Sequence, residues 1–164
     1  MWKILVVSDS HGDNDAVFAA MEKAGDYNSL IHLGDVGANW HEIESRCPWP
    51  AYFVRGNCDY DYSLKQALVL SFGEHRIYCC HGHMQGVHGG LNILRYTALE
   101  NECDIALYGH THIPFLAEAD EDVTILNPGS ISRPRQEGRK HTFCVITIDD
   151  DDKVSYSFDD IGRN

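Results

Sequence analysis

The chain begins with the stretch that decides its fold, Ile4-Leu5-Val6-Val7-Ser8-Asp9-Ser10-His11. Its apolar part is continuous rather than alternating, which is typical of a strand covered on both faces. A carboxylate and an imidazole follow directly where this strand ends. Because ligands bind at the carboxyl ends of strands in open α/β sheets, we expect an α/β fold that delivers Asp9 and His11 to a sheet edge.

The same arrangement recurs four more times. The later apolar runs end in Gly34-Asp35, Gly56-Asn57-Cys58-Asp59, His81-Gly82-His83 and Gly109-His110-Thr111-His112. Carboxylate and amide oxygens together with imidazoles suit borderline divalent metals such as Mn²⁺, Fe²⁺, Zn²⁺ or Co²⁺. One motif alone is a weak signal, since Asp9 also suits a helix cap and His110 a turn. Five motifs in this order, each behind a strand, indicate a metal site.

The hydrophobic pattern predicts helices at residues 14–24, 40–46 and 90–101. Strands are expected at residues 4–7, 30–33, 51–54, 67–72, 76–80, 105–108, 115–117, 123–126, 143–148 and 154–158. The strands at 67–72 and 76–80 are predicted to form a hairpin around Gly73-Glu74. The last strands are predicted to form a β-meander. This order indicates two sheets packed face to face with helices outside. We expect one domain spanning residues 1–164, because no linker interrupts the chain.

Composition excludes several function classes. The formal net charge of −12 over 164 residues repels nucleic acid and anionic membranes. No apolar run approaches the ~20 residues that span a bilayer. The six cysteines include no CxxC pair, and we expect reduced, mostly buried thiols in a soluble cytoplasmic protein. The acidic residues 149–152 are expected to form a solvated hairpin tip, because the spaced loop of a calcium-binding EF-hand is absent.

The order D-x-H, G-D, G-N-x-D, H-G-H and G-H-x-H resembles that of the calcineurin-like metallophosphoesterase superfamily. The short length and the Gly-Asn-Cys-Asp spelling are similar to its small YfcE-like phosphodiesterase branch, from Met1 to about Phe158. The resemblance implies a four-layer α-β-β-α sandwich of two mixed β-sheets. It also implies a dinuclear metal-dependent phosphodiesterase that hydrolyses small phosphodiesters by attack of metal-bound hydroxide.

The resemblance also implies roles for individual residues. The first metal would be held by Asp9, His11, Asp35 and His112, and the second by Asp35, Asn57, His81 and His110. Mn²⁺ is the expected ion, with Fe, Zn, Co, Ni and Mg as alternatives. The expected catalytic residues are Asp35, Asn57, Cys58, His81 and His83. The expected substrate-binding residues are Asn57, Ser130, Arg133 and Arg135.

Cys58 departs from the pattern of many larger members, which carry histidine there. That histidine is credited with stabilising the transition state or protonating the leaving oxygen. A thiol with a pKa of ~8.5 is a poor acid, so we expect diesters with good leaving groups to react better than alkyl monoesters. His83 either takes over the proton role or is a turn histidine at the rim. Arg133 and Arg135 either bind the substrate phosphate or are solvated surface arginines.

Two other functions share this fold or chemistry. A retromer subunit is similar in fold and mainly binds proteins, so a non-catalytic or weakly catalytic interaction scaffold is the alternative. Because every ligand position is filled and only Cys58 departs, the sequence favours the enzyme. A nuclease gains no support, since no basic stripe or aromatic platform is present. We expect a small phosphoester substrate and neither nucleic acid nor membrane as partner; similar proteins often self-associate, which leaves a homo-oligomer open.

Overall fold

A computed structural model describes residues 1–163 of the chain. The helices and strands found there agree with the predicted elements, and their ends differ by at most two residues. In chain order they are β1 (Trp2–Val7), α1 (Asn14–Ala24), β2 (Ser29–His32), α2 (Trp40–Arg46), β3 (Ala51–Phe53), β4 (Ala67–Phe72), β5 (His75–Cys80), α3 (Asn92–Glu100), β6 (Ile105–Leu107), β7 (Phe115–Ala117), β8 (Thr124–Asn127), β9 (Thr142–Ile148) and β10 (Val154–Asp160).

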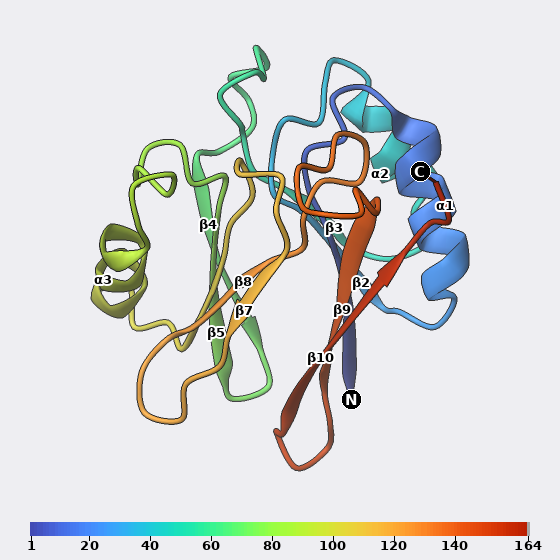
Figure 1. The fold of residues 1–164 in the computed structure, drawn as a ribbon. Coiled ribbons are helices and arrows are strands. Elements are labelled where there is room, and N and C mark those ends of the chain that lie inside the picture. The colour runs from blue at the N-terminus through green and yellow to red at the C-terminus, as the bar shows by residue number, and fades with distance from the viewer. Residues whose placement is uncertain (164) are drawn as a thin grey trace.

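Two five-stranded sheets pack face to face, with helices on their outer faces (Figure 1). The first sheet has the order β10-β9-β1-β2-β3 and the second β4-β5-β6-β8-β7. Both are mixed: β1, β2 and β3 run parallel beside antiparallel β9, and β5, β6 and β8 run parallel between antiparallel β4 and β7. Helices α1 and α2 cover the first sheet and α3 the second, so the predicted α-β-β-α sandwich is confirmed.

Strand β1 shows why its apolar run is continuous. Leu5 and Val7 belong to the core beneath α1 and α2, whereas Ile4 and Val6 belong to the core between the two sheets. All four side chains are fully buried. Because successive side chains of a strand point to opposite faces, a strand between two cores must be apolar at every position.

The second sheet repeats this alternation in its adjacent cysteines. Cys79 faces the core between the sheets, and Cys80 packs beneath α3 with Leu94 and Ala98. Leu99 of α3 is exposed, because it lies one step round the helix from the buried Ala98. The six cysteines are free thiols and five of them are buried.

The chain after β6 departs from the predicted β-meander. Strands β7 and β8 form a hairpin in the second sheet, and β9 and β10 form another in the first. The sheet that each strand joins depends on contacts with distant strands, which short apolar patterns do not encode. The acidic tip after β9 is a hairpin turn as expected, with Asp149 Oδ1 accepting from the amides of Asp151 and Lys153. Across residues 1–163, no helix has the length and hydropathy to cross a membrane.

Candidate metal centre

The predicted motifs meet where the carboxyl ends of both sheets adjoin. The first sheet contributes Asp9 and His11 after β1 and Asp35 after β2, and the second contributes residues that follow β5 and β6. Hydrogen bonds join the two sides, because the amide of His110 donates to Asp9 Oδ2 at 3.0 Å and Nδ1 of His81 donates to the Leu33 carbonyl at 2.7 Å. The sandwich therefore brings motifs from two sheets to one edge.

Five of the gathered residues hold left-handed backbone conformations. Their φ angles are 54° at Asp9, 48° at His11, 53° at Asp35, 69° at His110 and 61° at His112. Residues other than glycine seldom adopt this region, because Cβ crowds the backbone there. Such conformations persist where surrounding structure enforces them, and they cluster at functional sites.

The first group of facing donor atoms comes from Asp9, His11 and His112. Nε2 of His112 lies 3.1 Å from Asp9 Oδ1 and 3.3 Å from Nε2 of His11. The other ring nitrogen, Nδ1, lies 2.7 Å from the Arg133 carbonyl and donates to it. In the neutral ring Nε2 then carries a lone pair that faces a carboxylate oxygen. A cation bound between His112 Nε2 and Asp9 Oδ1 would be attracted to both of these acceptor atoms.

The second group comes from Asp35, His81 and His110. Nε2 of His81 lies 3.3 Å from Asp35 Oδ2, while its Nδ1 is bound to a carbonyl. The ring centroids of His81 and His110 are 5.1 Å apart. Burial lowers the pKa of His110 to about 4, and the nearby charge of His81 adds to the effect. His110 is therefore in the neutral form that binds metals.

Asp35 lies between the two groups. Its Oδ2 is 3.3 Å from Nε2 of His81 and 3.7 Å from Nε2 of His11, and its Oδ1 accepts from the Cys58 amide at 2.8 Å. Burial opposes ionisation of this carboxyl, but attraction to His81 and the hydrogen bond from the Cys58 amide hold its pKa well below the usual range. An ionised carboxylate thus faces both groups.

On two fully buried side chains at this edge, one atom each lacks a hydrogen-bond partner within residues 1–163. They are Asp9 Oδ1 and His81 Nε2, which lie 3.7 Å apart on fully buried side chains. An unsatisfied buried polar group costs roughly 1–3 kcal/mol, and more when it is charged. Such groups are rare in native proteins and usually have a cause. A divalent cation would supply the missing partner, so the donor set fits a metal.

Residues that sequence reasoning did not single out support the donors. Ser8 Oγ donates to Asp9 Oδ2 at 2.5 Å. The Asp59 carboxylate accepts from the amides of Asp35 at 2.8 Å and Gly56 at 2.9 Å. In the sequence, Asp59 could be recognised as the last residue of the Gly-Asn-Cys-Asp motif. For Ser8, the sequence offered no indication other than its position next to Asp9.

At two positions only glycine fits, because the backbone there passes very close to Asp35 or to Ser8. A Cβ atom at Gly56 would lie 2.1 Å from Asp35 Oδ1 and 2.3 Å from the Asp35 amide nitrogen. A Cβ atom at Gly109 would lie 2.1 Å from Ser8 Oγ. Each glycine therefore leaves room for a carboxylate or for the hydroxyl that holds one.

A cavity of 160 Å³ opens beside the first group. It is lined by His11, Asp35, Gly37, Cys58, Asp59 and Arg133. Arg133 therefore lies at the site. Arg135 is exposed and is not part of this lining; its backbone amide donates to the His112 carbonyl at 3.0 Å.

Three predicted residues have other surroundings. Asn57 is exposed, and its amide nitrogen lies 3.6 Å from Cys58 Sγ. The His83 ring centroid is 5.5 Å from that of His81, and its Nδ1 is buried without a partner within the described chain. Ser130 is fully buried and its Oγ donates to the Asp9 carbonyl at 2.8 Å. The structure thus gives Ser130 a role in positioning the Asp9 loop rather than in binding substrate.

Two histidines without a predicted role also lie at this edge. His32 is fully buried, with Nε2 2.8 Å from Ser10 Oγ and Nδ1 accepting from the Gly34 amide. Burial lowers the pKa of His32 to about 4, so it supports the turn as a neutral ring. The ring of His88 lies 4.6 Å from that of His110 at the rim. No sequence motif distinguished either residue.

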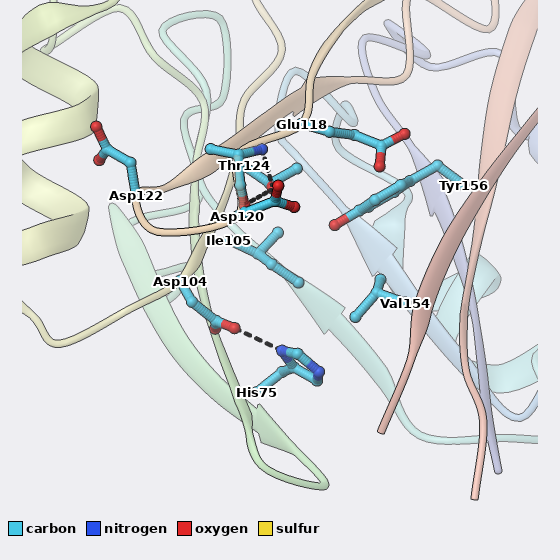
Figure 2. A pocket seen from close by; sticks show the side chains of 10 residues that line it. His75, Asp104, Ile105, Glu118, Asp120, Asp122, Thr124, Val154 and Tyr156 are labelled. Atoms are coloured by element: carbon cyan, nitrogen blue, oxygen red, sulfur yellow. Dashed lines mark hydrogen bonds and ion pairs between the residues drawn. The ribbon is translucent and has the colours of Figure 1, made fainter. Parts of the chain in front are cut away.

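A second cavity, of 230 Å³, lies at the opposite edge, beside the amino ends of β5, β6 and β8. Figure 2 shows His75 and Asp104 joined there, with Tyr156 across the cavity. Nδ1 of His75 is 2.5 Å from Asp104 Oδ2, and its Nε2 is 2.7 Å from the Asp152 carbonyl. Both ring nitrogens are therefore occupied by the protein itself.

Comparisons with known proteins agree with this geometry. The chain is 32% identical to the probable metallophosphoesterase YsnB of Bacillus subtilis, over 98% of this chain and 92% of that protein. It is 30% identical to the phosphodiesterase YfcE of Escherichia coli K12, over 82% of each. A crystal structure of a conserved uncharacterised protein from Streptococcus pneumoniae, described as a predicted phosphoesterase, matches with a TM-score of 0.84 at 31% identity, covering 98% of this chain and 90% of that one.

The fold is shared more widely than the sequence. Vps29 of Chaetomium thermophilum matches with a TM-score of 0.75 at 19% identity, over 96% of this chain and 94% of that one. Residues 2–151 match the family model of the calcineurin-like phosphoesterase superfamily domain. The chain therefore belongs to the calcineurin-like phosphoesterase superfamily, as the order of its five motifs predicted.

Proposed function

We propose that residues 1–164 form one domain that acts as a phosphodiesterase with two divalent ions, Mn²⁺ first among them. The proposal rests on two neighbouring donor groups and on the buried atoms without partners that they contain. Asp35 belongs to the second group, and its Oδ2 lies 3.7 Å from Nε2 of His11 in the first. The first ion would be held by Asp9, His11, Asp35 and His112, and the second by Asp35, His81, His110 and Asn57.

The chain's own residues suit phosphodiester chemistry. When bound, two divalent ions would polarise phosphoryl oxygens and lower the pKa of a coordinated water towards ~7. Arg133 lines the cavity, and a guanidinium can donate two parallel hydrogen bonds to phosphate oxygens. Burial and the neighbouring Asp35 carboxylate raise the pKa of the Cys58 thiol, so Cys58 is a weaker acid than an ordinary thiol. Substrates whose leaving group needs no proton are therefore favoured.

A substrate panel under metal exchange tests this function. The metal-stripped protein is loaded in turn with Mn²⁺, Zn²⁺, Co²⁺ or Mg²⁺ and assayed on aryl diesters, cyclic nucleotides and alkyl monoesters. We expect Mn²⁺-dependent hydrolysis, with aryl diesters as the fastest class. Faster turnover of alkyl monoesters would contradict the assignment to diesters, and hydrolysis that survives metal removal would contradict the metal centre.

An interaction scaffold is the rival function, since the Vps29 structures share this fold. The complete donor set and the unpartnered Asp9 Oδ1 favour the enzyme instead. A scaffold would show no hydrolysis with any metal of the panel, and its partner binding would survive the change Asp35→Asn. The six free thiols support our proposal that the protein is cytoplasmic. Size-exclusion chromatography with light scattering will decide whether it self-associates.

A further inference from the structure

Cys58 is the thiol that faces the cavity at the metal centre. Of the six free cysteines it is the exposed one, whereas the other five are buried. It lines the 160 Å³ cavity together with His11 and Asp35. A solute that enters this cavity therefore meets a sulfur atom beside an imidazole and a carboxylate.

The three side chains lie close enough to share an ion. The Cys58 sulfur, one ring nitrogen of His11 and one carboxylate oxygen of Asp35 are all within 4.8 Å of one another. An ion at the centre of a triangle of that size is about 2.8 Å from each corner, so small shifts reach the ~2.3 Å of a zinc–sulfur bond and the ~2.1 Å of a zinc–nitrogen bond. The Cys58 amide is held by Asp35 Oδ1 at 2.8 Å, which fixes the loop that carries the sulfur.

This donor set differs in chemistry from the two groups described above. Those groups offer oxygen and nitrogen atoms, which accept Mn²⁺ and other borderline or hard ions. Sulfur selects softer ions, and a coordinating thiol is deprotonated outright. A coordinating sulfur therefore adds to the preference for Zn²⁺ or Cd²⁺ over Mn²⁺.

We propose that Cys58, His11 and Asp35 form a binding site for a thiophilic divalent ion, Zn²⁺ or Cd²⁺, at the mouth of the catalytic cavity. The inference rests on the proposed metal centre, because His11 and Asp35 belong to both. As the sulfur–metal bond forms, the thiol proton passes to the buffer. The bound ion engages His11 and Asp35, so Zn²⁺ and Cd²⁺ compete with Mn²⁺ for the centre.

Cadmium titration tests the site without relying on activity. Metal-stripped wild type, Cys58→Ser and the control Cys103→Ser, which changes a buried thiol beneath α3, are titrated with Cd²⁺ while ultraviolet absorption is recorded. We expect sulfur-to-cadmium charge transfer in wild type and Cys103→Ser and its loss in Cys58→Ser. The affinity for Zn²⁺ should fall at least about tenfold in Cys58→Ser, with Mn²⁺ affinity unchanged.

Other outcomes are equally decisive. Equal charge-transfer absorption in wild type and Cys58→Ser, or equal Zn²⁺ affinity, would overturn the site, and circular dichroism establishes that each variant is folded. Mn²⁺-dependent hydrolysis is measured on the same samples. Hydrolysis by wild type without charge transfer overturns the Cys58 site and leaves the phosphodiesterase standing. Charge transfer without hydrolysis supports the Cys58 site and overturns the phosphodiesterase.

Discussion

The two edges of the second sheet carry the same kinds of side chain with opposite outcomes. At the amino ends of β5 and β6, His75 pairs with Asp104, and both nitrogens of His75 have partners. At the carboxyl ends, His81 faces Asp35, yet His81 Nε2 is buried with no hydrogen-bond partner in the described chain. The His75–Asp104 pair is thus satisfied within the protein, whereas the pair of His81 and Asp35 leaves a buried atom whose missing partner requires an explanation.

Cavity size does not single out the metal edge. The cavity beside His75 measures 230 Å³, whereas the cavity beside Asp35 measures 160 Å³. The larger one has the acidic side chains of Asp104, Glu118, Asp120 and Asp122 in its wall, beside apolar and aromatic residues. The smaller one combines a carboxylate, an imidazole, a thiol and a guanidinium. The mixture of donor types, rather than volume, identifies the site.

Exchanging one aspartate for asparagine at each edge tests this contrast most strongly. Asp35→Asn should lower Mn²⁺ affinity and hydrolysis by at least about 100-fold, because even supporting contacts of metal ligands contribute up to that factor. Asp104→Asn should keep both, since Asp104 holds only the opposite edge. Titration calorimetry measures the Mn²⁺ affinity of the two variants, and initial rates measure their hydrolysis. Comparable losses in the two variants would mean that the edges do not differ as described.

Adding a methyl group sharpens the comparison within the metal edge. Gly56→Ala should lower the free energy of unfolding by about 1–3 kcal/mol, because its Cβ would overlap Asp35. Mn²⁺ affinity should fall as well. Gly89→Ala is the control, since its Cβ meets only the Gly86 carbonyl at 3.5 Å, and its effect should stay within about 0.5 kcal/mol. Urea denaturation compares the two variants, and equal stabilities would contradict the tight packing around Asp35.

The smallest effect is expected at the opposite edge and depends on pH. Burial disfavours a charged His75, but the Asp152 carbonyl and the Asp104 carboxylate raise its pKa above the ordinary 6.5. Protonated His75 therefore stabilises the folded state fully below a pH of about 6.5, and this contribution is lost as pH rises through the folded pKa. The difference in unfolding free energy between wild type and His75→Gln should shrink over that rise in a urea denaturation series. A difference that does not change with pH would show that the pair is not charged.

Local features made much of the protein predictable. Apolar runs and helical stripes placed the helices and strands to within two residues, because hydrophobic periodicity depends on neighbours in sequence. The donor residues were also visible, since each follows its own strand. The predicted β-meander was wrong because strand pairing among β7, β8, β9 and β10 depends on distant strands.

The amino-acid sequence by itself determined the strand ends and the donor types that they carry, because both are written within a few consecutive residues. Only the tertiary structure decided which donors share Asp35, which atoms stay unpartnered and which side chains hold them in place. The hydroxyl of Ser130 supports the carbonyl of Asp9 across 121 residues of sequence. Contacts of that range arise when two sheets pack together, and no short pattern encodes them.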